Sequence, residues 1–374
     1  MRPLHPLLKV ALFVAFLFLL CELFIYYLVI IQCSWPTIKS DNNDALRAFF
    51  ISDTHLLGSR QGHWFDKLRR EWQMTRAFQS AMTILNPDAV FVLGDLTDEG
   101  KWASDYEFDA TVRRFWTMFY HNSDVDFNVV AGNHDIGFHD VIEPNRQHRF
   151  EVKFKTPSVQ VLTIKDNVFV LVNSITMETD MCSMCSTATE QLRRASMQLN
   201  CTKYGSTNGQ ISDSKSSKEC DSIQKLPKVA PILLQHYPLW RVSDAMCTGV
   251  DAAPPNERYE KFRPGYGALP LDASQRLLSW IQPRLVISGH THYNCYVVHD
   301  GDVPEISVPS FSWRNLNNPS IVLATISKDK YEIGKCFLPQ ESTVKMIYII
   351  GVLTLAIWFL LNVKKLKKSL VGKS

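Results

Sequence analysis

The feature that most constrains the fold of this chain is a set of five short apolar runs, each ending in polar, metal-capable residues. In chain order they are AFFISDTH, AVFVLGD, FNVVAGNHD, ILLQH and LVISGHTH. Apolar runs of this length, rich in β-branched and aromatic residues, are typical of buried strands. Because ligands bind beyond the carboxyl ends of strands in an open α/β sheet, five such endings predict one shared site.

The wider pattern of elements predicts an α/β core in a single domain. The segment Trp64–Leu85 has apolar residues at helical spacing and ends before Asn86-Pro87. Strand, helix and strand in succession favour largely parallel pairing. We interpret residues 200–228, dense in Ser, Thr, Asn, Gly and Lys, as a polar surface loop. The expected strands are Ala48–Ile51, Ala89–Leu93, Asn128–Ala131, Val168–Val172, Pro231–Leu234 and Leu285–Ile287.

Two longer apolar stretches predict membrane-spanning helices. Val10–Ile31 would be about 33 Å long as a helix and Met346–Val363 about 27 Å, which suits a bilayer core. The alternatives are a cleaved signal peptide for the first and a buried core helix for the second. Glu22 opposes spanning by about 2.5–3.5 kcal/mol, which its many apolar neighbours can offset.

Basic residues flank both stretches on the outer side and predict the topology. Arg2 and Lys9 precede the first stretch, and five lysines follow the second. The positive-inside rule therefore places both ends in the cytoplasm. The expected organisation is a cytoplasmic N-terminus (1–9), a transmembrane helix (10–31), a lumenal domain (32–345), a transmembrane helix (346–363) and a basic cytoplasmic tail (364–374).

The net charge of +3 belongs to these tails. Without their seven basic residues and Glu22, the chain keeps 33 basic residues against 36 acidic ones. A mildly acidic body does not indicate a nucleic-acid-binding surface.

Most cysteines lie in the predicted lumenal body, where an oxidising environment lets them pair, although the sequence leaves the pairing open. Cys201 and Cys220 are available to tie the polar loop, and Asn200-Cys201-Thr202 is a glycosylation sequon. Cys182-x-x-Cys185 fits a redox pair, half of a zinc site or a structural disulfide, and a lumenal location favours the disulfide.

The ligand types narrow the chemistry of the predicted site. Carboxylate, amide and imidazole groups without thiolate suit Mn, Fe or Zn better than a structural zinc site. Asp95 is a short carboxylate able to bridge two ions. A pair of metals can activate water and clamp a phosphoryl group, so a covalent nucleophile is not needed. Neither a GxSxG elbow, a Walker loop nor a dinucleotide fingerprint is present in the sequence.

The motif series D53-x-H55, G94-D95, G132-N133-H134-D135, H236 and G289-H290-T291-H292 resembles the calcineurin-type metallophosphoesterase superfamily. The resemblance implies an αββα double-sheet sandwich with a dinuclear metal centre, flanked here by the two transmembrane helices. It implies that one metal is held by Asp53, His55 and His292, the other by Asn133, His236 and His290, and that Asp95 bridges them. It also implies that His134 protonates the leaving oxygen or steadies the transition state, with Asp135 orienting His134.

Longer stretches are similar to a membrane-bound group within this superfamily that remodels glycosylphosphatidylinositol (GPI) anchors. They are DTHLLG, GHWFDKLRREWQM, LGDLTDEGKW, VVAGNHDIGFH, LLQHYPL, SGHTH and VPSFSWRN. The resemblance implies a Mn-dependent phosphodiesterase that removes ethanolamine phosphate from the second mannose of GPI-anchored proteins and so promotes their export. Its expected location is the membranes from endoplasmic reticulum exit sites to the cis-Golgi. A C-terminal lysine retrieval signal is expected of the group, and the ending LVGKS departs from that pattern.

Two other functions remain as alternatives, and the catalytic motifs alone do not exclude the first. One is hydrolysis of another phosphoester, such as a phosphoprotein, a nucleotide or a phospholipid. The other is a non-catalytic scaffold with the same fold, but such a chain should lack ligands, and this one lacks none of the expected set. The sequence does not determine the oligomeric state.

Surface or packing roles are expected for His63, His139 and His148, which lie near metal motifs and could also touch substrate. Contact with an anionic glycolipid and a solvated helix face explain Arg60, Lys67 and Arg69 equally well. The run Phe311–Asn315 fits either the mouth of the site or internal packing, and the sequence leaves its role open.

Overall fold

The first of two β-sheets carries three of the predicted strands. The computed structural model describes residues 6–38, 44–178, 180, 182–204 and 220–371. Strands β1 to β3 pair in parallel, β10 pairs antiparallel with β1, and β11 pairs antiparallel with β10. The order of the five strands is β11 (Tyr331–Phe337), β10 (Ser320–Ile326), β1 (Leu46–Ile51), β2 (Ala89–Leu93) and β3 (Asp126–Val130).

The second sheet carries the other three predicted strands. Strands β5, β6, β7 and β9 pair in parallel, and β4 and β8 close the two edges in antiparallel pairings. The order of the six strands is β4 (Val159–Ile164), β5 (Asn167–Val172), β6 (Ile232–Gln235), β7 (Leu285–Ser288), β9 (Val303–Ser307) and β8 (Cys295–His299).

The core lies between the two sheets and again between each sheet and its helices. The Phe91 ring stacks on Phe50 of its own sheet at 5.2 Å between centroids, and it contacts Phe169 of the other sheet at 4.9 Å. Strands buried on both faces need apolar residues at successive positions, which explains the continuous apolar runs of the sequence. The expected αββα double-sheet sandwich is confirmed.

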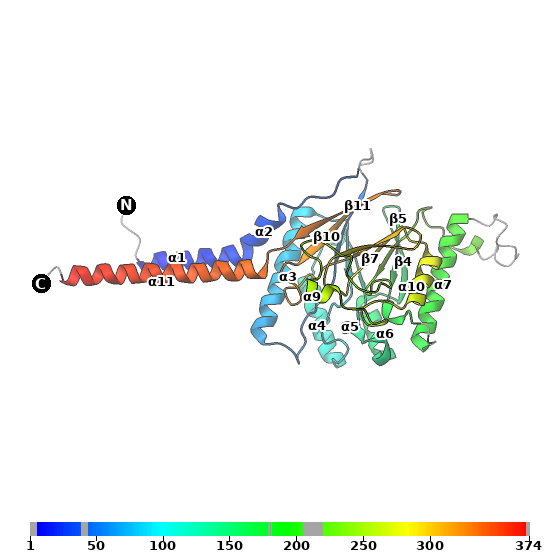
Figure 1. Cartoon of the computed structure of the whole chain (residues 1–374), viewed down its shortest axis with the longest axis horizontal. Coiled ribbons are helices and arrows are strands. Elements are labelled where there is room, and N and C mark those ends of the chain that lie inside the picture. The colour runs from blue at the N-terminus through cyan, green and yellow to red at the C-terminus, as the bar shows by residue number, and fades with distance from the viewer. Residues whose placement is uncertain (1–5, 39–43, 179, 181, 205–219, 372–374) are drawn as a thin grey trace.

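Helices cover the outer faces of both sheets (Figure 1). On one side lie α3 (Trp64–Leu85) and α4 (Asp105–Met118), and on the other α7 (Ser183–Tyr204) and α10 (Leu271–Ile281). The bounds of α3 agree with the predicted helix. Shorter helices in the described part of the chain include α5 (Asn133–Ile136), η2 (His139–Val141), α6 (Pro144–Phe154), η3 (Ser174–Thr176) and α9 (Pro255–Arg258).

The two apolar stretches form a paired stalk that projects from the globular body (Figure 1). Both helices are long and apolar enough to cross a membrane. Inside the pair, the Tyr348 hydroxyl donates to Glu22 at 2.6 Å, so the acidic residue has a polar partner. The stalk consists of α1 (Pro6–Leu19), the π-helical turn η1 (Leu20–Phe24), α2 (Ile25–Ile30) and α11 (Glu341–Val371).

Three sequence expectations differ from the structure in detail. The first apolar helix begins at Pro6, and Ile25, Tyr26 and Ile30 are buried against the body, because hydropathy alone does not distinguish lipid from protein surroundings. The expected polar loop begins inside α7, which continues to Tyr204; residues 205–219 lie outside the described part. Strands β4 and β8–β11 were not predicted.

Candidate metal centre

The loops that follow the strands hold the expected ligands in an uncommon backbone conformation. Five of the seven have positive φ angles: Asp53 (55°), His55 (44°), Asp95 (50°), His290 (74°) and His292 (64°). Residues other than glycine are sterically strained at positive φ, and such strain is concentrated at functional sites. The fold therefore turns these side chains towards a common point against local preference.

The first group of side chains joins the ends of β1 and β7. His55 Nε2 lies 3.7 Å from Asp53 Oδ1 and 3.3 Å from His292 Nε2. The distance from His292 Nε2 to Asp53 Oδ1 is 3.6 Å. Asp53 and His55 are buried, whereas His292 is partly exposed. Three ligand-type atoms therefore converge within the reach of a single ion.

The second group comes from the loops after β2, β3, β6 and β7. Asp95, His236 and His290 place one ligand-type atom each within reach of a common ion. Asn133 joins them from the start of α5, with its Oδ1 atom 3.1 Å from His236 Nε2. Together the two groups contain all seven expected ligands.

Asp95 lies between the two groups. Its Oδ2 atom is 3.5 Å from His55 Nε2 in the first group and 3.4 Å from His236 Nε2 in the second. Its other oxygen, Oδ1, accepts a hydrogen bond of 2.7 Å from the His134 backbone amide. One carboxylate oxygen is thus shared by both groups while the second is held by the backbone, as expected of a bridging ligand.

Hydrogen bonds on the outer side of the histidine rings fix their orientation. His236 Nδ1 lies 2.7 Å from the Leu93 carbonyl, and His290 Nε2 lies 2.6 Å from the Tyr266 carbonyl. When one ring nitrogen donates to an oxygen, the other presents its lone pair, which is how metal-ligating histidines are commonly held. In both residues the opposite ring nitrogen is left for the centre.

The charges of the site fit divalent cations. Asp53 Oδ1 is buried and has no hydrogen-bond partner among the described residues. Although burial opposes it, the surrounding carboxylates raise the pKa of His55 to about 10 and that of His236 to about 9. The buried carboxylates thus favour positive charge on the neighbouring histidines. Metal ions would supply that positive charge instead.

His134 lies beside the centre with its side chain partly exposed. Its Nδ1 atom is 3.2 Å from Asp98 Oδ1 and 3.2 Å from Lys101 Nζ. Asp98 Oδ1 also lies 3.0 Å from His55 Nδ1, and Asp98 Oδ2 forms an ion pair with Arg314 Nη2 at 2.9 Å. Despite burial, the bonds from His134 and His55 hold the pKa of Asp98 well below its usual range.

The expected orienting role of Asp135 is not what the contacts show. The Asp135 carboxylate accepts hydrogen bonds from the backbone amides of Leu96, Thr97 and Gly132. It therefore braces the loops around Asp95, and Asp98 takes the place beside the His134 ring. Backbone amides in a buried loop need hydrogen-bond partners, and here Asp135 supplies them. The spacing of residues in the sequence does not reveal this pairing.

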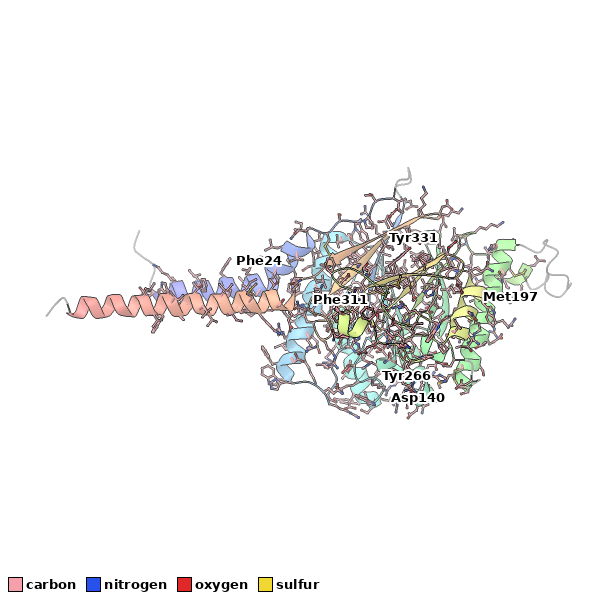
Figure 2. All side chains as sticks on the ribbon, viewed as in Figure 1. Phe24, Asp140, Met197, Tyr266, Phe311 and Tyr331 are labelled. Carbon is pink, nitrogen blue, oxygen red and sulfur yellow. A yellow bond between two sulfur atoms is a disulfide. The ribbon has the colours of Figure 1, made fainter. Side chains whose placement is uncertain are left out.

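Sequence reasoning missed Asp98, Lys101 and Arg314 as neighbours of the centre. Asp98 follows the LGD motif by three residues, within the LGDLTDEGKW stretch, and that proximity was the available signal. Arg314 belongs to the Phe311–Asn315 run, whose role the sequence left open. In the structure Phe311, which Figure 2 labels, is buried in the core, as is Trp313. Arg314 forms an ion pair with Asp98.

Comparisons with known proteins agree with this geometry. Residues 46–294 match the family model described as calcineurin-like phosphoesterase. The chain belongs to the calcineurin-like phosphoesterase family. It is 50% identical to metallophosphoesterase 1 of Danio rerio over 94% of this chain and 91% of that protein. It is 48% identical to metallophosphoesterase 1 of Cricetulus griseus, covering 97% and 91% of the two chains.

A solved structure of a dimetal phosphatase from Danio rerio is 12% identical, with a TM-score of 0.45 over 79% of this chain and 99% of that one. Membership of the calcineurin-like phosphoesterase family makes this chain a metal-dependent phosphoester hydrolase. The family implies a dinuclear metal site, and the two groups described above are its candidate ligands.

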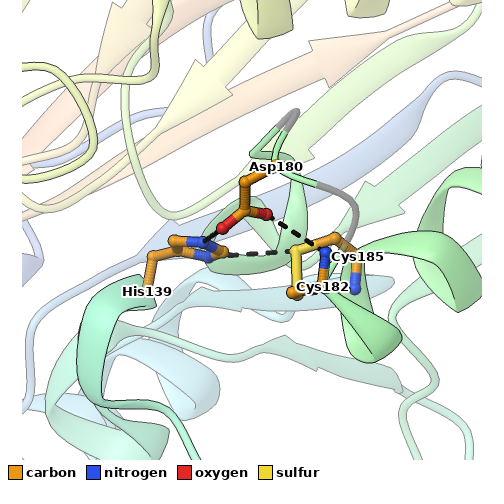
Figure 3. Close-up of side chains that lie close together, drawn as sticks. All are labelled: His139, Asp180, Cys182 and Cys185. Carbon is orange, nitrogen blue, oxygen red and sulfur yellow. Dashed lines mark hydrogen bonds and ion pairs between the residues drawn. A yellow bond between two sulfur atoms is a disulfide. The ribbon is translucent and has the colours of Figure 1, made fainter.

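Four disulfides accompany this calcineurin-like domain, and they use all the cysteines except the buried Cys21. Cys182 and Cys185 are bonded to each other, which agrees with the disulfide interpretation and closes their sulfurs to a metal. Figure 3 shows this pair beside His139, whose Nε2 atom lies 2.7 Å from Asp180 Oδ2. The other bonds are Cys33–Cys336, Cys201–Cys220 and Cys247–Cys295.

Proposed function

We propose that this chain is a membrane-held two-metal phosphodiesterase that removes ethanolamine phosphate from the second mannose of GPI anchors. Its substrates are GPI-anchored proteins, and the reaction promotes their export from the endoplasmic reticulum. The proposal places the enzyme between endoplasmic reticulum exit sites and the cis-Golgi, with both chain ends cytoplasmic and the catalytic domain lumenal.

The observation that carries the two-metal chemistry is the shared position of Asp95 Oδ2 between His55 and His236. In this proposal Asp53, His55 and His292 hold one ion, and Asn133, His236 and His290 hold the other. Manganese is the proposed metal, with iron and zinc as alternatives, because oxygen and imidazole ligands suit all three. When bound, the pair of ions supplies Lewis-acid stabilisation of the phosphoryl oxygens and an acidified water.

His134 is the proposed proton donor to the leaving oxygen. Its Nδ1 atom faces Asp98 and Lys101, so Nε2 is the nitrogen left to meet the substrate. The nearby Asp98 carboxylate stabilises the protonated ring, and Arg314 in turn stabilises Asp98. A donor at this position matters most for a diester, because its leaving alkoxide is a strong base.

The two apolar helices support the choice of a membrane-held substrate. They pair with each other and emerge from the body together, which suits a domain tethered close to one bilayer surface (Figure 1). Four disulfides are typical of proteins folded in an oxidising compartment. The high identity to metallophosphoesterase 1 over nearly the whole chain, including both helices, supports the same assignment.

The test uses the purified full chain, reloaded with Mn²⁺, and GPI glycolipids in detergent or vesicles. We expect release of ethanolamine phosphate from the second mannose, detected by mass spectrometry of the glycan. Asp53→Ala and His134→Ala should abolish the release. Retained activity in both variants would contradict the mechanism. Faster hydrolysis of a phosphoprotein, a nucleotide or a phospholipid at equal enzyme concentration would contradict the substrate.

A further inference from the structure

The first half of α3 exposes an apolar stripe next to the stalk. Trp64, Phe65, Leu68 and Trp72 are 68%, 55%, 57% and 40% exposed. At 3.6 residues per turn these four side chains fall within an arc of about 100°. The buried positions Met74, Ala77 and Ala81 lie on the opposite side of the helix. A contiguous group of exposed large apolar side chains marks an interaction surface, whereas single exposed apolar residues do not.

Contacts with the stalk show which way the stripe faces. Trp72 Nε1 donates to the Glu22 carbonyl of η1 at 3.0 Å, so a member of the stripe touches the first apolar helix. Arg69, on the same half of α3, forms an ion pair with Glu341, the first residue of α11. Helix α3 thus contacts both helices of the stalk. Its stripe includes Trp72, which makes the contact with η1.

The direction of α3 suits a surface at the base of the stalk. Figure 1 shows α3 running across the direction of α1 and α11 at the point where they meet the body. A helix placed in this way lies along a bilayer that the stalk crosses. Trp and Phe on one face and cations beside them are typical of helices at the membrane interface. The Arg76 guanidinium lies 5.7 Å from the centre of the Trp72 ring and supplies such a cation.

We propose that Trp64, Phe65, Leu68 and Trp72 dock α3 on the lumenal surface of the bilayer and thereby set the height of the metal centre above it. This inference rests on the membrane placement in the proposed function. The link to the centre is short. Helix α3 begins nine residues after His55, and the amides of Arg60 and Gln61 in the intervening loop bind Glu99, the neighbour of Asp98.

The first experiment measures lipid contact without using activity. The full chain is reconstituted in phosphatidylcholine vesicles with the photocrosslinking residue p-benzoylphenylalanine in place of Trp64 or Leu68. The matched control places it at Leu271, which is 52% exposed at the start of α10 on the other side of the body. We expect lipid adducts from positions 64 and 68 and none from 271. Equal adducts at all three positions, or adducts to a second copy of the chain instead of lipid, would overturn the proposal.

The second experiment separates docking from catalysis. The combined variant Trp64→Ser, Phe65→Ser and Leu68→Ser should hydrolyse the soluble diester bis(p-nitrophenyl) phosphate at the normal rate. Its hydrolysis of vesicle-held GPI should fall on the order of tenfold, because apolar contact area with the bilayer is lost. Leu271→Ser should change neither rate. Unchanged GPI hydrolysis in the triple variant would overturn the role of the stripe, whereas failure of the normal chain on GPI would contradict only the proposed substrate.

Discussion

The metal centre and the apolar stripe of α3 differ in both burial and polarity. At the centre, Asp53, Asp95 and His236 are fully or almost fully buried and are held by hydrogen bonds, and the backbone of Asp53 and Asp95 is strained. In the apolar stripe of α3, by contrast, large apolar groups such as Trp64 are exposed. Burying charged groups is unfavourable unless groups of opposite charge pair with them. Exposing a contiguous apolar stripe to water is unfavourable unless an apolar surface covers it.

Each region is complementary to something that the protein chain does not supply. The centre has carboxylates that call for cations, and the stripe has aromatic groups that suit an apolar surface. If this division is correct, changes at the centre should affect every substrate, whereas changes near the stalk should affect only substrates held in a membrane.

The largest effect is expected for Asp95→Ala. The variant loses the oxygen shared by both groups, so metal content should fall and hydrolysis of soluble and membrane-held diesters should drop to background. Elemental analysis and initial rates provide the measurement. Asp251→Asn, which alters a buried carboxylate paired with Lys335 outside the centre, is the control. Full metal occupancy in the alanine variant would refute a bridging role.

His134→Gln should leave the metals in place and slow the reaction. Loss of a general acid typically lowers the rate by about 10²–10⁴-fold, and the loss should be greatest for diesters with poor leaving groups. Rates are measured for a series of aryl phosphodiesters, with metal content determined in parallel. His121→Gln serves as the control, because His121 stacks on Phe127 away from the centre. A uniform loss across the series would contradict a proton-donating role.

Asp98→Asn tests whether Asp98, rather than Asp135, supports His134. Asp98 also holds the candidate metal ligand His55, and removing a carboxylate behind a metal-ligating histidine commonly costs about 10–100-fold in activity or metal affinity. We expect a loss in this range on soluble and membrane-held substrates alike. Asp135→Asn should instead lower the melting temperature, since its carboxylate braces backbone amides. The opposite pattern in the two variants would restore the sequence-based assignment.

The smallest effect on catalysis is expected for the double change Cys33→Ser and Cys336→Ser. This disulfide ties the segment after α2 to β11 across 303 residues of sequence. Its loss should reduce the free energy of unfolding by about 2–5 kcal/mol, measured by thermal denaturation. The rate on a soluble diester below the transition should not change. A large loss of that rate would show that the stalk and the centre are more closely coupled than the comparison implies.

Much of the fold was predictable because it depends on local patterns. The six expected strands and the helix Trp64–Leu85 appear at or near the predicted positions, because buried elements need consecutive or periodic apolar residues. The unpredicted strands include the edge strand β11, whose sequence YEIGKCF is interrupted by polar residues and lacks a continuous apolar run. An edge strand relies on pairing with its neighbour, which a local pattern does not describe.

The sequence by itself determined the chemical types at the centre and the presence of two apolar helices. Asp, Asn and His at strand ends specify the ligands, and the length of an apolar run specifies a possible span. Only the tertiary structure decided that Asp95 lies between His55 and His236, that Asp98 rather than Asp135 faces His134, and that the α3 stripe adjoins the stalk. The physical reason is that these relations join residues far apart in the chain, whose contacts depend on how the sheets and helices pack.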